Sequence, residues 1–229
     1  MKIKIFTQLL VFIIALTSLV FPSAAGAEAR EKKINEIPTK QELLERGVKH
    51  EKVDKLLNKM KSGVKLESDI FLEDSNNILA TNENPYFRKE FSDGSFVEST
   101  IEDITEEEKD NIFSIAAVEQ IGGLQENRTL RVSTNQTWGS QSFDVKVYFP
   151  LIGYSKINQA YNWQYFGSVY ATDYKGIYRA SETASADAVA MQKLVVEIPK
   201  TGVRYLAKLE FRMRDGRFWS TYTDSRVIQ

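Results

Sequence analysis

The densest group of side chains with binding chemistry is the stretch AYNWQYFGSVYATDYKGIY, residues 160–178, which holds seven aromatic residues. Aromatic rings on an exposed strand offer a flat apolar surface to a ligand such as a sugar, whereas inward rings fill the core of a β-sandwich. Tyr161, Trp163 and Tyr165 alternate, so an undisturbed strand would place all three on one face. These three residues are therefore the first candidates for ligand binding.

The phase of the alternation changes further along this stretch. Phe166, Tyr170 and Tyr174 occupy even positions, and the change falls at Phe166–Gly167, where a bulge or a turn is expected. We therefore expect two strands or one bent strand, with at least one of the two aromatic sets in the core. Exposure of Trp163 with its neighbours would make the stretch a binding site.

A second candidate surface lies on the hairpin that Asp215–Gly216 is expected to form. A two-residue turn there pairs Arg212 with Trp219 on the outer face of the sheet, which Arg204 and Lys208 would share. A tryptophan beside cations on a wet face could bind a sugar or an anion. The structural alternative is a surface cation–π pair that shields the sheet. This surface is the better candidate if Trp163 is buried.

Catalytic and metal-binding chemistry is poorly represented in the chain. It has no cysteine and one histidine, His50, outside the predicted β domain, so neither a nucleophile–histidine pair nor a zinc cluster is expected. No phosphate-binding loop or dinucleotide fingerprint is present. A glycosidase needs only two carboxylates, but no pair stands out among the acids of the β region: Asp144, Asp173, Glu182, Asp187, Glu197, Glu210, Asp215 and Asp224.

We therefore predict no catalytic residue, no metal site and no cofactor. The acidic residues between 67 and 126 could offer oxygen ligands to calcium, but their spacing matches no calcium-binding loop and indicates a solvated segment. An enzyme would need a cleft that holds two carboxylates without cationic partners. Because the sequence singles out no such pair of carboxylates, we expect that the protein is not an enzyme.

The first 27 residues have the pattern of a secretory signal peptide. Two early lysines precede an apolar run, and the small residues PSAAGA place a cleavage site near Ala27. The apolar run is slightly short for a membrane anchor, and no later segment resembles a transmembrane span. Secretion without cysteine is typical of a bacterial source, and a Gram-positive one fits.

The segment 28–63 is predicted to be a disordered start followed by a small helical hairpin. The motif TKQE, residues 39–42, is a capping box that begins the first helix. A second helix over about 49–61 has an apolar side and a lysine-rich side. Docking of this hairpin on the main domain is favoured over membrane binding, because the apolar stripe is short.

Residues 64–126 read as an acidic linker that contains one β-hairpin at 86–103. Asp93–Gly94 would form a two-residue turn that pairs Phe91 with Phe96 and Lys89 with Glu98. Residues 67–126 include 16 acidic and 3 basic residues, a charge of −13, whereas residues 28–66 carry +4 (11 basic, 7 acidic) and 127–229 carry +6 (14 basic, 8 acidic). Such alternating segments of opposite net charge indicate solvent-exposed faces, or a basic domain that binds an anionic surface.

From residue 127 the pattern is β throughout. The segments 143–149 and 203–214 alternate strictly between apolar and polar residues, as expected for strands with one buried face. We predict an all-β fold, an antiparallel β-sandwich over 127–229, with immunoglobulin-like and barrel-like variants both open.

The chain resembles a group of Gram-positive secreted proteins whose C-terminal domain is described only as a domain of unknown function. The residues that carry this resemblance are FSDGSFVES, SFDVKVYF and GIYRASETASADAVA, within about 86–229. The resemblance implies a secreted all-β domain and no particular activity.

Taken together, these features predict a secreted, non-catalytic interaction module. Its expected partner is a cell-envelope glycan or an anionic wall polymer, and a nucleic acid is not expected because the chain carries an export signal. The alternative is a secreted toxin or bacteriocin-like factor that acts on neighbouring cells, with the basic helical hairpin as its membrane-binding part. The sequence leaves the oligomeric state open.

Overall fold

The computed structural model of the chain describes residues 37–73, 77–105, 126–167, 169–197 and 204–226. The chain divides into two units, 1–32 and 33–229, and all the described residues belong to the second. The predicted signal peptide lies outside the described residues. Among the described helices, none has the length and apolar character needed to span a membrane.

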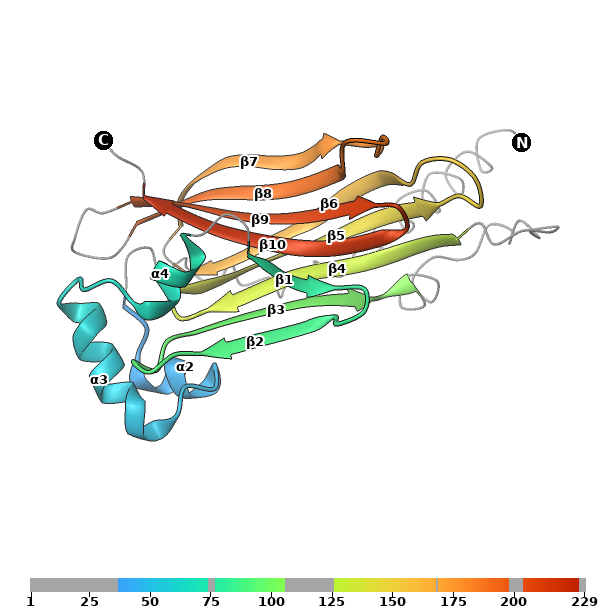
Figure 1. The fold of residues 1–229 in the computed structure, drawn as a ribbon. Coiled ribbons are helices and arrows are strands. Elements are labelled where there is room, and N and C mark those ends of the chain that lie inside the picture. Colours follow the sequence, from blue (N-terminus) through green and yellow to red (C-terminus); the bar gives the residue numbers. More distant parts are fainter. Residues whose placement is uncertain (1–36, 74–76, 106–125, 168, 198–203, 227–229) are drawn as a thin grey trace, which may run out of the picture. The chain divides into compact units, whose positions relative to one another are not determined.

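The described residues form two antiparallel five-stranded sheets, which confirms the predicted β-sandwich (Figure 1). Sheet A has the order β1 (Ile78–Thr81), β10 (Arg217–Arg226), β9 (Arg204–Arg214), β8 (Ala188–Glu197) and β7 (Val169–Arg179). Sheet B has the order β2 (Tyr86–Glu90), β3 (Phe96–Asp103), β4 (Glu126–Gln136), β5 (Gly139–Phe149) and β6 (Lys156–Gly167). The chain thus begins sheet A, builds all of sheet B, and then returns to complete sheet A.

The core lies between the two sheets, and the alternation in the sequence explains its composition. In β5 the side chains of Phe143, Val145 and Val147 are buried, and in β9 those of Leu209 and Phe211 are buried from the opposite sheet. Polar neighbours in both strands point away from this core, because successive side chains of a strand point to opposite faces. The two segments of strict alternation are therefore confirmed as strands that each contribute one apolar face.

In the described part of the chain, three helices precede the strands: α2 (Lys40–Glu45), α3 (His50–Lys61) and α4 (Glu67–Leu72). The capping box that begins α2 is present, since Thr39 N donates to Glu42 Oε2 at 2.7 Å and Glu42 N donates to Thr39 Oγ1 at 3.2 Å. The apolar side of α3 is buried in a second cluster that includes Phe96 of β3. The partly buried Trp138 packs against the same cluster, so the helices pack on sheet B at its β2–β3 end.

The segment 64–126 was predicted to be a linker, and the described part of it differs. It forms α4 and the three strands β1, β2 and β3, and these strands are integral to both sheets. β1 pairs with β10 near the end of the chain, with Ile78 opposite Thr221 and Thr81 opposite Trp219. A boundary at 127 therefore does not separate the sandwich from what precedes it, because β3 pairs with β4 across that position.

The predicted register of the β2–β3 hairpin is also wrong. Glu90, not Phe91, lies opposite Phe96, and Arg88, not Lys89, lies opposite Glu98. The turn spans five residues, 91–95, closed by a bond of 2.9 Å from Phe91 N to Ser95 O. The longer turn frees the carboxylate of Asp93 to bind the helices, as described below.

The hairpin between β9 and β10 has the predicted register. Arg212 lies opposite Trp219 and Arg214 opposite Arg217, with Asp215 and Gly216 at φ of 53° and 72°. Both turn residues thus have the positive φ that a tight hairpin turn of this type requires. The outer face of sheet A accordingly carries the residues predicted for it.

Candidate functional site

The aromatic stretch 160–178 forms two strands, β6 and β7, which belong to opposite sheets. The chain crosses between the sheets immediately after Gly167, where the sequence predicted a break. Gly167 has a φ of 121°, and a Cβ atom placed on it would lie 2.6 Å from the carbonyl oxygen of Trp138. Only glycine fits this close approach without a shift of the backbone.

The first aromatic set does not share one face, contrary to the prediction. Asn162 adopts a φ of 52°, and the register between β5 and β6 shifts there, because Asp144 lies opposite Tyr161 and Ser142 opposite Gln164. This bulge turns Trp163 inward, where its ring stacks on that of Phe143 with 4.6 Å between the centroids. One extra residue in a strand reverses the face of every side chain that follows it.

The three predicted ligand-binding aromatics are therefore separated. Tyr161 stays on the outer face, with Lys146 Nζ 5.4 Å from its ring centroid. Trp163 packs against the core, and Tyr165 lies opposite Gln141 at the edge of the sheet with 37% of its surface exposed. They form no common platform for a flat ligand.

The outer face of sheet A brings Trp219, Arg212 and Lys208 together as predicted, but its cations are paired. Arg212 Nε donates to Glu210 Oε2 at 2.7 Å, and Lys208 Nζ lies 3.0 Å from Glu210 Oε1. Arg212 Nη1 also bonds Asp187 Oδ2 at 3.0 Å. Burial acts to raise the pKa of Glu210, yet the hydrogen bonds from Arg212 and Lys208 outweigh it and lower the pKa.

Arg204, at the other end of the same face, is paired as well. Its Nε donates to Glu197 Oε2 at 3.0 Å, and its guanidinium lies 3.8 Å from the ring centroid of Tyr170. The cations on this face are thus engaged with neighbouring carboxylates and a ring, which leaves little uncompensated positive charge for an anionic polymer. This arrangement supports the structural alternative for the basic face.

A groove between α2 and the outer face of sheet B is the more promising site. With its open mouth it measures about 870 Å³. Its walls come from α2, from the β4–β5 hairpin and from the end of β6, and its lining residues are Glu42, Glu45, Arg46, Ser133, Thr134, Asn135, Ser140, Gln141, Ser142 and Phe166. The lining is dominated by hydroxyl, amide and charged groups, with one aromatic ring at its edge.

Arg46 and Phe166 fix one side of this groove. Arg46 Nη1 donates to the carbonyl oxygens of Gln136 at 3.1 Å and Thr137 at 3.2 Å, which anchors α2 to the β4–β5 turn. Its guanidinium lies 4.8 Å from the centroid of the Phe166 ring. Half of the Phe166 side chain remains exposed, so a positioned ring borders the groove.

The floor of the groove offers hydroxyl and amide groups at regular spacing. Asn135 of β4 lies opposite Ser140 of β5, and Ser142 lies opposite Ser133, whose hydroxyl is 2.5 Å from that of Thr100. The described residues give the side chains of Asn135, Ser140 and Ser142 no hydrogen-bond partner. Sequence reasoning missed these residues, although their period of two along both strands would have placed them on one face.

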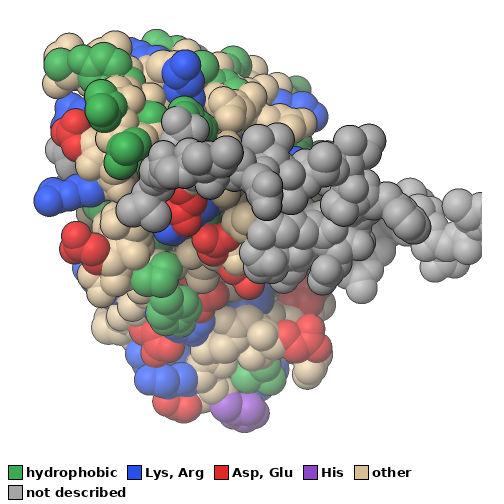
Figure 2. Space-filling view, turned by 90° about the vertical axis from the view of Figure 1, so that its right-hand side faces the viewer, with side chains coloured by type: hydrophobic (Ala, Val, Ile, Leu, Met, Phe, Trp, Pro, Cys, Tyr) green, Lys and Arg blue, Asp and Glu red, His purple; other side chains and the backbone are tan. Residues whose placement is uncertain are grey.

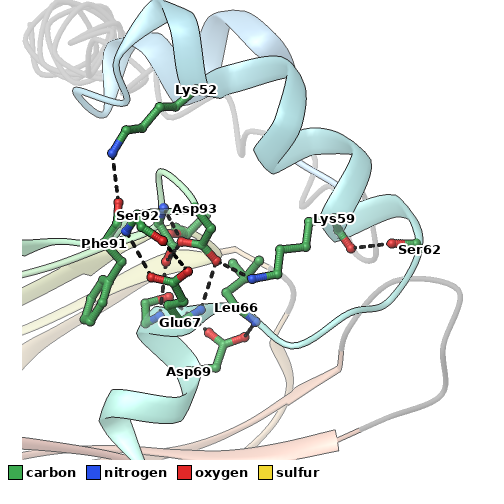
Figure 3. A network of polar contacts seen from close by, with 12 residues as sticks. Lys52, Lys59, Ser62, Leu66, Glu67, Asp69, Phe91, Ser92 and Asp93 are labelled. Carbon is green, nitrogen blue, oxygen red and sulfur yellow. Dashed lines mark hydrogen bonds and ion pairs between the residues drawn. The ribbon is translucent and has the colours of Figure 1, made fainter.

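A polar network ties α3 and α4 to the β2–β3 turn (Figure 3). The buried carboxylate of Asp93 accepts hydrogen bonds from Lys59 Nζ at 2.7 Å, Glu67 N at 3.0 Å and Ser95 N at 3.0 Å. Burial acts to raise the pKa of Asp93, but these bonds lower it to about 2. In addition, Lys52 Nζ donates to Phe91 O at 3.0 Å, so α3, α4 and the turn form one rigid support.

Nothing in this region resembles a catalytic centre. His50 begins α3 and is exposed, and within the described ranges no group of three or more His, Asp or Glu side chains is placed to hold a metal ion. Figure 2 shows acidic and basic side chains interspersed on one face of the molecule, with hydrophobic side chains gathered near its top.

Comparison of the chain with protein-family models, with curated proteins and with solved structures found no match in any of the three.

Proposed function

We propose that the protein is a secreted, non-catalytic module that binds a cell-envelope glycan in the groove between α2 and sheet B. The observation that carries this proposal is the lining: the side chains of Asn135, Ser140 and Ser142, which have no hydrogen-bond partner among the described residues, lie on one face of the sheet and are bordered by the half-exposed ring of Phe166. A sugar presents hydroxyl groups to such a floor and apolar C–H surface to such a ring. Secretion rests on the signal-peptide pattern of residues 1–27.

The same contacts favour a glycan over an anionic wall polymer. An anionic polymer would need a run of uncompensated cations, and the cations on the outer face of sheet A bind Glu210, Glu197 and Asp187. At the groove, Glu42 and Glu45 stand beside Arg46. The local charge is therefore mixed, which suits a neutral or weakly charged glycan.

Sedimentation with purified cell walls tests this function. We expect the protein to pellet with the walls, and the binding to weaken by about tenfold in Phe166→Ala, because loss of a stacked ring removes about 1–2 kcal/mol. Ser142→Ala, which removes the hydroxyl without adding bulk, should weaken it as well. Tyr178→Ala is the matched control, since Tyr178 is 66% exposed and lies outside the groove. Wild-type protein that stays in the supernatant at low salt contradicts the proposal.

One observation favours the alternative of a secreted factor that acts on membranes. In the loop between β5 and β6, Leu151 and Ile152 are 60% and 89% exposed, and Tyr154 is 50% exposed. Exposed aliphatic side chains beside a tyrosine are typical of segments that enter the membrane interface. Release of dye from anionic vesicles by the wild-type protein, and not by Ile152→Asp, would favour this function over glycan binding.

A further inference from the structure

A second cavity, more enclosed than the groove, is lined by residues of both sheets and by Asp69 of α4. It measures about 490 Å³ with its mouth, but its interior has room for only about two water molecules. It shares Ser140, Gln141 and Phe166 with the groove. Its polar wall is formed by Asp69, Gln141, Tyr222 and Asp224.

Asp69 is held by three hydrogen-bond donors in this wall. Its Oδ2 accepts from Leu66 N at 3.1 Å and from Trp138 Nε1 at 3.3 Å, and its Oδ1 accepts from Ser68 Oγ at 3.3 Å. Only 3% of Asp69 is exposed. The carboxyl group is thus fixed in orientation by α4 and Trp138.

Two oxygen atoms of the cavity wall have no donor. Asp224 Oδ1 and Gln141 Oε1 are fully buried without a hydrogen-bond partner among the described residues, and their side chains are 8% and 5% exposed. The neighbouring Tyr222 hydroxyl accepts hydrogen bonds from the amides of Gln136 and Gln141, the second at 3.5 Å. A buried acceptor without a donor costs free energy unless something else fills the role.

Among the described residues, the two carboxyl groups also have no cation that pairs with them directly. Lys65 is the cation that acts on both Asp69 and Asp224, but its ammonium group forms an ion pair with Glu73. Burial raises the pKa of both carboxyl groups, and the nearby charges of Asp69 and Glu73 raise that of Asp224 further. The polar part of the wall is therefore rich in acceptors and short of positive charge, whereas Val169, Leu194 and Val196 make the rest of the wall apolar.

We propose that this cavity binds a calcium ion, with Asp224 and Asp69 as carboxylate ligands and Gln141 Oε1 as an amide ligand. All the candidate metal ligands are oxygen atoms, which suits a hard cation such as calcium rather than zinc. Two carboxylates balance the charge of a divalent ion, and the small interior accommodates one ion with a bound water and no organic ligand. The cavity adjoins the groove through Ser140, Gln141 and Phe166, but neither carboxylate ligand lines the groove, so the proposal does not depend on glycan binding there.

Terbium luminescence tests the site directly, because Tb³⁺ replaces calcium at oxygen ligands and is excited through a nearby indole. Trp138 bonds Asp69 and is placed to sensitise an ion in the cavity. We expect emission from the wild-type protein that excess calcium abolishes. Asp224→Asn and Asp69→Asn should each weaken Tb³⁺ binding by at least about tenfold. Asp54→Asn is the control, since this side chain is 72% exposed and distant from the cavity.

Thermal unfolding gives a second measurement that does not depend on luminescence. Saturating calcium at neutral pH should raise the Tm of the wild-type protein by about 5 °C relative to a chelator. Calcium should leave the Tm of Asp224→Asn unchanged. This variant should still unfold in a cooperative transition when the chelator is present, as expected of a folded protein. Tb³⁺ emission that persists in both variants would overturn the proposal. So would a wild-type Tm that does not change with calcium and rises only as the pH falls, because protons would then be the compensating charge.

Discussion

The indole of Trp163 stacks on the ring of Phe143 with 4.6 Å between centroids and 29° between the ring planes. This contact makes Trp163 part of the sandwich interior. We expect Trp163→Ala to lower the free energy of unfolding by about 2 kcal/mol, less than for a fully buried tryptophan because the side chain is only half-buried. Denaturant unfolding measures this loss.

Binding to cell walls should be unchanged in the same variant when it is measured below its unfolding transition. Tyr178→Ala serves as the control for stability, because 66% of Tyr178 is exposed and little apolar surface leaves water when it folds. A Trp163→Ala protein that keeps its stability but no longer binds walls would restore the stretch 160–178 as the binding site.

Asp93 is the second position at which the structure predicts a loss of stability on substitution. Its carboxylate holds Lys59 of α3 and the first turn of α4 at once. We expect Asp93→Asn to lower the free energy of unfolding by about 2 kcal/mol, because it removes the charged partner of the partly buried Lys59 ammonium group. Asp54→Asn, at an exposed ion pair with Lys40, should cost less than about 0.5 kcal/mol.

The effect of Asp93 should depend on pH with a definite sign. Its pKa is lowered from 3.8 to about 2 in the folded protein, so its contribution to stability is complete above about 3.8 and is lost as the pH falls through about 2. The difference in unfolding free energy between wild type and Asp93→Asn should shrink over that interval. Denaturant titrations at a series of acidic pH values measure it, and a constant difference would contradict the ionised state of Asp93.

Local features of this fold were predictable from the sequence. The capping box of Thr39 and Glu42 depends on residues three apart, and the β9–β10 register follows from Asp215–Gly216 alone. Strict alternation in β5 and β9 identified the buried faces, because a strand has a period of two. Each of these signals lies within a few residues of the structure that it specifies.

Non-local features escaped prediction for a physical reason. The bulge at Asn162 is a single residue with positive φ, and no glycine marks it, so the inward turn of Trp163 left no signal. Asp69 and Asp224 are 155 positions apart and meet only because α4 packs near the end of β10. The groove likewise requires α2 to lie across strands that follow it by about 90 residues, the separation of Arg46 and Gln136.

Arg212 provides a test of the paired basic face. Its guanidinium bonds both Glu210 and Asp187, and Glu210 is only 3% exposed. Arg212→Ala should lower the free energy of unfolding by about 2 kcal/mol, since it leaves a buried carboxylate short of donors. Arg217→Ala, at the exposed end of the β9–β10 hairpin, should change it by less than about 0.5 kcal/mol. Loss of wall binding in Arg212→Ala without loss of stability would instead assign this face to an anionic ligand.

A comparison of Gly167 with Gly153 separates the energetic cost of backbone strain from that of a steric clash. Gly167 and Gly153 both have positive φ, 121° and 106°, but a Cβ at Gly167 would meet the carbonyl oxygen of Trp138 at 2.6 Å, whereas Gly153 has nothing within 4 Å. Gly153→Ala should therefore cost only the backbone strain, about 1 kcal/mol. Gly167→Ala should cost at least about 3 kcal/mol, because the crossing between β6 and β7 must move away from the β4–β5 turn. Denaturant unfolding measures the free energy of unfolding lost in each variant. Equal losses would mean that the added Cβ at Gly167 is accommodated without a steric cost.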